Sequence, residues 1–188
     1  MGDLHRKPRP PVRERLLEAA DRLFYEQGVR AVGIDRVLAE ADAAKASLYS
    51  HFGCKDELIA AYVARRTEAA RTAIDNYVAQ IPPAERAIRF FDYVVDWTAQ
   101  PEFRGCPVQH VVGELTDCNH PARQLAHAQR SWLVGRLTEW ARAAGAADPE
   151  RMAGALLTLF DGAVAAAEQD GPQRARDAKW AAQRLLAQ

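Results

Sequence analysis

Residues 32–58, VGIDRVLAEADAAKASLYSHFGCKDEL, constrain the fold of this chain more than any other stretch. Their apolar residues have the spacing of the inner faces of two short helices, with Val37, Leu38 and Ala41 in the first and Leu48 and Phe52 in the second. Between the two helices lie only a few residues around Asp42, which is enough for a sharp turn. This pattern predicts a helix-turn-helix unit, whose second helix can enter a DNA major groove.

The second of these helices presents a polar surface once its apolar residues face inward. We expect its outward residues, together with a lysine in the first turn of the next helix, to contact DNA: Lys45, Ala46, Ser47, Tyr49, Ser50, His51 and Lys55. Ammonium, hydroxyl, phenol and imidazole groups can donate hydrogen bonds to phosphates or base edges. Because such helix spacing is common, an ordinary solvated face is the alternative.

The flanking residues favour DNA binding. The matching pattern runs Arg15-Leu16-Leu17-x-Ala19-Ala20-x-x-Leu23-Phe24-x-x-x-Gly28, then Ile34-x-x-Val37-x-x-x-Ala41, then Lys45-x-Ser47-Leu48-Tyr49-x-His51-Phe52-x-x-Lys55-x-x-Leu58. This closely resembles the N-terminal DNA-binding domain of the TetR family of bacterial transcriptional regulators. The resemblance implies a homodimeric regulator, most often a repressor, that binds a palindromic double-stranded operator and is released by a small-molecule effector.

The chain departs from the family pattern at four positions. Gly33 stands where the family usually has Thr or Ser, Asp42 replaces the usual Gly of the turn, Ala44 replaces a capping Ser, and Ala46 replaces a frequent Gly. Asp tolerates the left-handed conformation better than most residues. An Ala cap forfeits about 1 kcal/mol relative to Ser. The core positions are kept, so the expected fold is unchanged.

The remaining sequence predicts helices and no strand, and therefore an all-α fold of about nine helices. Apolar periodicity and Gly and Pro positions place them at about 12–27, 34–41, 45–51, 55–80, 84–99, 105–115, 119–144, from 148 onward, and 172–187. We expect a homeodomain-like helix-turn-helix domain over residues 1–54, with an N-terminal arm. A helical effector-binding and dimerisation domain is expected over residues 55–188.

Charge gives a local signal only. The chain has 25 basic and 25 acidic residues, and so a formal charge of +0. Its N-terminal segment, in contrast, carries a net charge of +3 from Arg6, Lys7, Arg9, Arg13 and Arg15 against Asp3 and Glu14. Residues 1–10 have the character of a basic, extended arm, and some DNA binders insert such arms into the minor groove. A terminus without a role is the alternative.

Composition and hydropathy predict a cytoplasmic protein. The hydrophobic content of 48% is sufficient for a core. No segment approaches the ~18 apolar residues of a membrane span, and no apolar signal region follows the N-terminal cations. Three cysteines suit a reducing compartment and do not form a disulfide framework.

The middle of the chain has more aromatic surface than a small core needs. We expect a mostly apolar or aromatic ligand there, with His110 and Glu114 as its polar contacts. The candidate ligand-binding residues are Phe90, Tyr93, Trp97, Phe103, Cys106, His110, Glu114 and Trp132. A plain packed core is the alternative.

Four possible metal ligands, Cys106, His110, Glu114 and Cys118, recur every four residues. On one continuous helix the two cysteines would lie about 18 Å apart, so a single tetrahedral site cannot use all four residues. We therefore expect no metal and no cofactor. A thiol redox switch is a further alternative, and it requires a lowered cysteine pKa.

The last two helices have apolar faces that could form an intermolecular four-helix bundle. The residues expected at this dimer interface are Leu156, Phe160, Ala163, Ala178, Ala182 and Leu185, with the intramolecular core as the alternative. The motifs of serine hydrolases, P-loop enzymes, dinucleotide-binding enzymes and zinc proteases are absent, which argues against an enzyme. The rival interpretation is a helical ligand-binding or catalytic protein whose helix-turn-helix is only structural.

Overall fold

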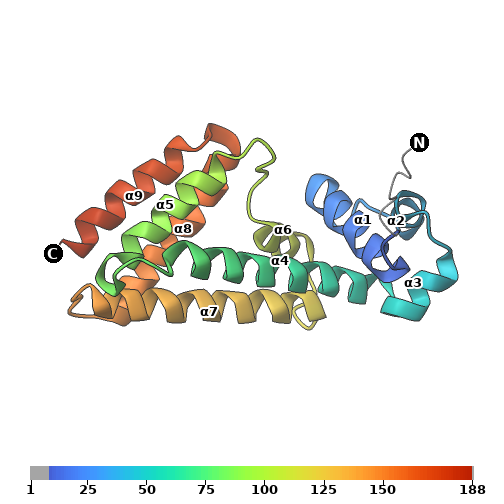
Figure 1. The fold of residues 1–188 in the computed structure, drawn as a ribbon, viewed down its shortest axis with the longest axis horizontal. Helices are drawn as coiled ribbons and strands as arrows, with labels where there is room; N and C mark the ends of the chain where they lie inside the picture. Colours follow the sequence, from blue (N-terminus) through green and yellow to red (C-terminus); the bar gives the residue numbers. More distant parts are fainter. Residues whose placement is uncertain (1–8, 188) are drawn as a thin grey trace, which may run out of the picture. The chain divides into compact units, whose positions relative to one another are not determined.

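The structure is a computed structural model that describes residues 9–187 and is all-helical over that range (Figure 1). Its elements are α1 (Val12–Gln27), α2 (Ile34–Ala41), α3 (Lys45–Phe52), α4 (Lys55–Val78), the 3-10 helix η1 (Pro83–Glu85), α5 (Arg86–Thr98), α6 (Pro107–Glu114), α7 (Pro121–Ala143), α8 (Pro149–Asp170) and α9 (Gln173–Leu186). Residues 1–8 of the expected N-terminal arm lie outside the described residues. The expected all-α class with nine α-helices is confirmed within that range.

The chain divides into two compact units, Met1–Tyr62 and Val63–Gln188. In the first unit α1 packs against α2 and α3, and its core is built from the apolar faces that the sequence indicates. Its large side chains below 2% exposure are Leu16, Val29, Val37, Leu48, Leu58 and Tyr62. Gly28 ends α1 with φ 88°, a conformation that residues with a side chain rarely adopt.

The division falls inside α4, later than the domain boundary expected at residues 54 and 55. Leu58, Ile59 and Tyr62, in the first two turns of α4, are buried. Tyr62 meets Phe24 of α1 edge-on, with the ring centroids 5.6 Å apart. The start of α4 therefore belongs to the core of the helix-turn-helix unit, and the same helix continues into the second unit.

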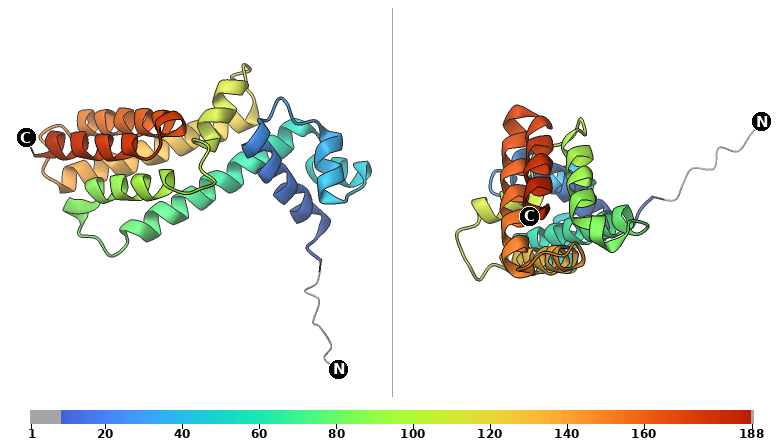
Figure 2. Two further views of the ribbon diagram at one scale, coloured as in Figure 1. Left: turned by 90° about the horizontal axis from the view of Figure 1, so that it is seen from above. Right: turned by 90° about the vertical axis from the view of Figure 1, so that its left-hand side faces the viewer.

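In the second unit α8 packs against both α7 and α9, and α5 packs against α9 (Figure 2). The core between them is apolar and includes Phe90, Phe91, Leu137, Trp140 and Leu156, each at most 2% exposed. Proline and capping residues fix the helix starts. Asp148 accepts the Arg151 N–H at 3.0 Å at the start of α8, and Pro149 occupies its first turn.

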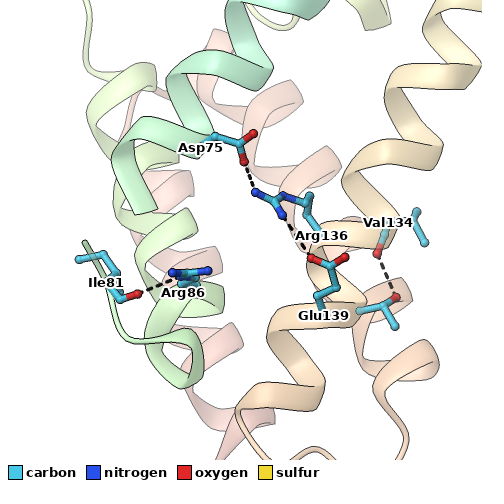
Figure 3. A network of polar contacts seen from close by, with 7 residues as sticks. Asp75, Ile81, Arg86, Val134, Arg136 and Glu139 are labelled. Carbon is cyan, nitrogen blue, oxygen red and sulfur yellow. Dashed lines mark hydrogen bonds and ion pairs between the residues drawn. The ribbon is translucent and has the colours of Figure 1, made fainter. Parts of the chain in front are cut away.

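Polar contacts join α4 to α7 on one side of this unit. Arg136 of α7 forms an ion pair with Asp75 of α4 and a second contact of 3.2 Å with Glu139 (Figure 3). In the same view Arg86 donates to the carbonyl oxygen of Ile81 at 2.9 Å, which closes the turn between α4 and α5. These contacts fix the second half of α4 against α7.

Several helix boundaries differ from those expected, mostly by one or two residues. Residues Pro83–Glu85 form a 3-10 helix before α5, so the α-helix begins at Arg86 and not at 84. Helix α6 ends at Glu114, so the exposed Cys118 lies beyond it. The recurrence of possible metal ligands every four residues is therefore not carried by one helix. Within residues 9–187, no helix has both the length and the apolar character needed to cross a membrane.

Candidate nucleic-acid interface and effector site

Helix α3 buries one narrow face and presents the rest to solvent. Leu48 and Phe52 are its buried residues. Of the seven residues expected to contact DNA, the structure places five at the surface and two half-buried: Lys45, Ala46, Tyr49, Ser50 and His51 are exposed, whereas Ser47 and Lys55 are intermediate. Tyr49 is 46% exposed, so its ring and hydroxyl group are accessible to a partner outside this chain.

The turn before α3 has the conformation that the family's usual glycine would adopt. Asp42 has φ 46° and ψ 58°, and it is the one non-glycine residue with positive φ among residues 9–187. Its N–H donates to the Ala39 carbonyl oxygen at 3.3 Å, and the Ala43 N–H donates to that of Leu38 at 3.1 Å. Ala44 precedes α3 without any side-chain cap, as expected from the alanine.

Three arginines from the start of the chain bind the helix-turn-helix itself. Arg15 donates to the carbonyl oxygens of Ala41 at 3.0 Å and Asp42 at 2.7 Å, at the C-terminal end of α2. The guanidinium of Arg13 lies over the ring of Phe52, 5.2 Å from its centroid. Arg9 forms an ion pair with the carboxylate of Asp42. The sequence revealed the basic character of this segment but not these partners.

The Arg9–Asp42 pair lies in solvent. Both side chains are mostly exposed, at 58% for Arg9 and 79% for Asp42. The hydrogen bond and charge of Arg9 hold the pKa of the Asp42 carboxyl below its usual value, so that Asp42 is ionised at neutral pH. Because such an exposed pair is weak, another anion can compete for the arginine.

Four of the residues expected to bind a ligand form a continuous row of aromatic rings. Phe90 stacks on Tyr93 at 6.5 Å, Tyr93 stacks on Trp97 at 6.4 Å, and Trp97 meets Phe103 edge-on at 5.2 Å. Phe90 is fully buried, whereas the other three rings are half-buried. Burial raises the pKa of the Tyr93 hydroxyl, so that it stays protonated.

Cys106 lies next to this row, at the start of α6. Burial raises the pKa of its thiol, although the nearby backbone N–H groups of Gln109 and Val108 act in the opposite direction. The thiol is therefore protonated at neutral pH. Cys106 is the N-cap residue of α6, but its side chain makes no capping hydrogen bond. A redox-sensing cysteine needs a lowered pKa, so this environment does not support the alternative of a thiol switch.

His110 pairs with Glu168 of α8, a residue that the sequence did not indicate. The His110 Nε2 and Glu168 Oε2 atoms lie 3.2 Å apart. Gly105 lies directly against this pair: a Cβ added there would approach both atoms to 2.6 Å, and its φ is +83°. Fifty-eight residues separate His110 from Glu168, and no motif links them, so only the packing of α6 near α8 could reveal the contact.

Further polar contacts hold α6. Gln109 donates to Asp161 of α8 at 2.9 Å, and Arg130 of α7 donates to the other oxygen of that carboxylate at 2.8 Å. Arg123 of α7 donates to the carbonyl oxygens of Val112 and Leu115 at the end of α6. Val111 is the one fully buried residue of α6. Helix α6 is therefore held against α7 and α8 mainly by polar contacts. Glu114, the second residue expected to orient the ligand, is half-buried at its last turn.

Trp132 lies apart from the aromatic row and takes part in the contact between α4 and α7. Its ring is 5.5 Å from the guanidinium of Arg71 and 6.0 Å from that of Arg136. Among residues 9–187, no group of three or more His, Cys, Asp or Glu side chains is placed to hold a metal ion.

Most residues expected at a dimer interface are buried within the single chain. Leu156, Ala163, Ala178 and Ala182 are at most 6% exposed, and Phe160 packs on Phe90 with ring centroids 5.4 Å apart. Their burial agrees with the alternative of an intramolecular core. Leu185 is half-buried. In contrast, Trp180 on α9 is 61% exposed, and the Arg184 guanidinium lies 5.6 Å from its ring centroid.

Comparison with known proteins agrees with these features. Residues 16–62 match the family model described as "Bacterial regulatory proteins, tetR family". The HTH-type transcriptional regulator LmrA of Bacillus subtilis (strain 168) is 33% identical over 124 residues, which span 64% of this chain and 66% of that protein. The chain thus aligns with slightly less than two thirds of LmrA.

Solved structures extend the similarity to nearly the whole chain. SCO4454, a TetR-family transcriptional regulator from Streptomyces coelicolor, is 32% identical and superposes with a TM-score of 0.89 over 94% of both chains. The sav143 regulator from Streptomyces avermitilis is also 32% identical, with a TM-score of 0.76 over 93% of this chain and 99% of that one. This chain therefore belongs to the TetR family of transcriptional regulators.

Proposed function

We propose that this regulator is a homodimeric repressor that reads a palindromic operator with α3 and leaves it when a small molecule binds the second unit. The observation that carries the DNA-binding role is the outward face of α3. An eight-residue helix that exposes Lys45, Tyr49 and His51 beside a tight turn offers donors for phosphates and base edges. The proposed functional domains are the DNA-binding helix-turn-helix over residues 1–54 and the effector and dimerisation domain over 55–188, although the first turns of α4, up to Tyr62, pack in the first compact unit.

The proposed effector site comprises the aromatic row and the neighbouring α6. The aromatic row supplies apolar surface. Helix α6 supplies polar side chains, among them His110 and Glu114, with which a ligand can form hydrogen bonds. A mostly apolar or aromatic effector fits this composition. Such a ligand lowers operator affinity if it binds more tightly to the form that is unsuited to DNA.

The proposed dimer uses the exposed faces of α8 and α9, since their apolar residues are largely used within the chain. On α8 the exposed residues include small ones at helical spacing, namely Gly154, Thr158, Gly162 and Ala165. Trp180 of α9 supplies a large exposed aromatic side chain, the type enriched at the centre of interfaces. A symmetric dimer would present two copies of α3 to two half-sites.

We propose that the protein represses transcription, which is the common mode in the family. Similar proteins are named for both modes: FasR of Mycolicibacterium smegmatis is named an activator, and DhaR of Mycobacterium sp. is named a repressor. A gel shift with the DNA upstream of the chain's own gene, against a random duplex of equal length, tests sequence-specific binding. A reporter behind the same promoter then tests whether the protein represses or activates transcription. Equal affinity for both duplexes would favour the rival interpretation, in which the helix-turn-helix has only a structural role.

A further inference from the structure

We infer that Asp42 is a counter-charge that keeps Arg9 from the DNA phosphates and so lowers the affinity of this protein for DNA of arbitrary sequence. The inference rests on the proposed DNA-binding role of α3. The juxtaposition that carries it is an ion pair between residue 9, just before α1, and the turn that leads into α3. Asp42 precedes Lys45, the first residue of α3, by three positions.

The backbone of the turn does not require a carboxylate. A left-handed residue with φ 46° is satisfied by glycine, or by asparagine, which also tolerates this conformation. The carbonyl oxygens of Ala41 and Asp42 are bound by the guanidinium of Arg15, whatever the side chain at position 42. The carboxylate of Asp42 therefore contributes its charge and its contact with Arg9, and it is not needed for the geometry of the turn.

The charge lies where it can act on DNA. The Debye length is about 10 Å at 0.1 M salt, so an ionised carboxylate next to a DNA-reading helix repels phosphates that approach that helix. It also neutralises Arg9, which would otherwise be a mobile cation at the edge of the same surface. Because both side chains are largely exposed, removal of the carboxylate leaves the arginine able to reach a phosphate.

The test is the salt dependence of binding to a random-sequence duplex, which needs neither the operator nor the effector. The slope of log K against log salt changes by about 0.9 for each phosphate that a cation neutralises. We compare the full-length wild type with Asp42→Asn, Arg9→Gln and the double variant. Asp42→Gly serves as a second variant that fits the same backbone conformation. Glu150→Gln is the matched control, since it removes one acid from another exposed ion pair, with Arg142 on the second unit.

Asp42→Asn and Asp42→Gly should each bind the random duplex several-fold more tightly at low salt, with a slope steeper by about 1. Arg9→Gln should change the slope less in the wild-type background than in the Asp42→Asn background, because the Asp42 carboxylate competes with the phosphates for the guanidinium. The double variant should return to the wild-type slope, and Glu150→Gln should not differ from wild type.

Three results would overturn the inference: an unchanged slope in Asp42→Asn and Asp42→Gly, a double variant that keeps the steeper slope, or an equal change in Glu150→Gln. If these occur while α3 variants still lose DNA binding, the inference alone fails. If the wild type shows no salt-dependent binding to any duplex, the proposed function fails with it.

Discussion

Arg136 on α7 forms an ion pair with Asp75 on α4, and its guanidinium also lies 6.0 Å from the ring of Trp132 and 5.7 Å from that of Trp140. Helix α4 begins in the helix-turn-helix unit and continues into the second unit. The contact therefore fixes, within the second unit, the helix that both units share.

Arg136→Gln should lower the free energy of unfolding by about 1–3 kcal/mol, because it removes an ion pair and two cation–π contacts together. Urea unfolding followed by circular dichroism measures this change. The control is Arg142→Gln, which breaks an exposed pair with Glu150 and should cost less than about 0.5 kcal/mol. Equal effects of the two variants would show that the Arg136 contacts add nothing to stability.

The contact of Gly105 with the His110–Glu168 pair gives a second prediction. Gly105→Ala should destabilise the protein by about 1–2 kcal/mol, because φ is +83°, a conformation that alanine rarely adopts. The new Cβ would also come within 2.6 Å of the His110 and Glu168 side-chain ends, which would have to move aside. Gly113→Ala is the matched control on α6. It has open space around the added Cβ, and it should stabilise the helix by about 0.5–1 kcal/mol. Thermal and urea unfolding of both variants compare them directly. A neutral Gly105→Ala would contradict the packing described at the start of α6.

The three thiols should differ sharply in reactivity. Cys54 and Cys118 are exposed, whereas Cys106 is protected at the start of α6 and burial raises the pKa of its thiol. In the native protein at neutral pH, a disulfide reagent such as dithionitrobenzoate should modify two thiols quickly and the third much more slowly. Cys106→Ser identifies the slow one. Fast modification of Cys106 would reopen the possibility of a redox switch.

Substitutions at buried and at exposed positions of α8 and α9 should have different effects. Ala182→Glu places a charge at a position that is fully buried in one chain, so it should lower the thermal stability strongly. Ala165→Glu and Trp180→Glu change exposed positions and should leave the fold intact while shifting the protein to monomers. Sedimentation at micromolar concentration tests this. A wild-type monomer under these conditions would contradict the proposed dimer.

The helix-turn-helix could be predicted almost to the residue because its information is local. Apolar spacing, Gly28 and the tight turn at Asp42 determine α1 to α3 with little help from the rest of the chain. In the second unit the helices were also predictable, but the partner that each apolar face contacts was less so. A period of 3.6 shows which residues are buried, and it does not distinguish the core of one chain from a contact between two. For this reason Leu156 and Ala182 were expected at an interface and are buried in the chain.

Pairings across long sequence separations could not be predicted. Glu168 and Asp161 lie on α8, and nothing in the sequence pattern of that helix indicates that they meet His110 and Gln109 of α6. The sequence shows the positive charge of Arg9, just before α1, and of Arg15, within α1. Their contacts with the Asp42 turn depend on the packing of α1 against α2, which is a tertiary property.

In the proposed function, the outward face of α3 reads DNA. The most direct measurement is the binding isotherm for the upstream duplex at two salt concentrations, for wild type, Lys45→Ala, Tyr49→Ala, His51→Ala and Lys55→Ala. His127→Ala, an exposed histidine of α7, is the matched control for His51→Ala.

Each α3 variant should lose about 1–3 kcal/mol of binding with no loss of thermal stability, and Lys45→Ala should also relax the preference for the upstream duplex over a random one. Lys55→Ala should weaken all sequences alike and reduce the salt slope by about 1, if it meets a phosphate. His127→Ala should bind as the wild type does. Unchanged isotherms for all four variants at both salt concentrations would contradict the account.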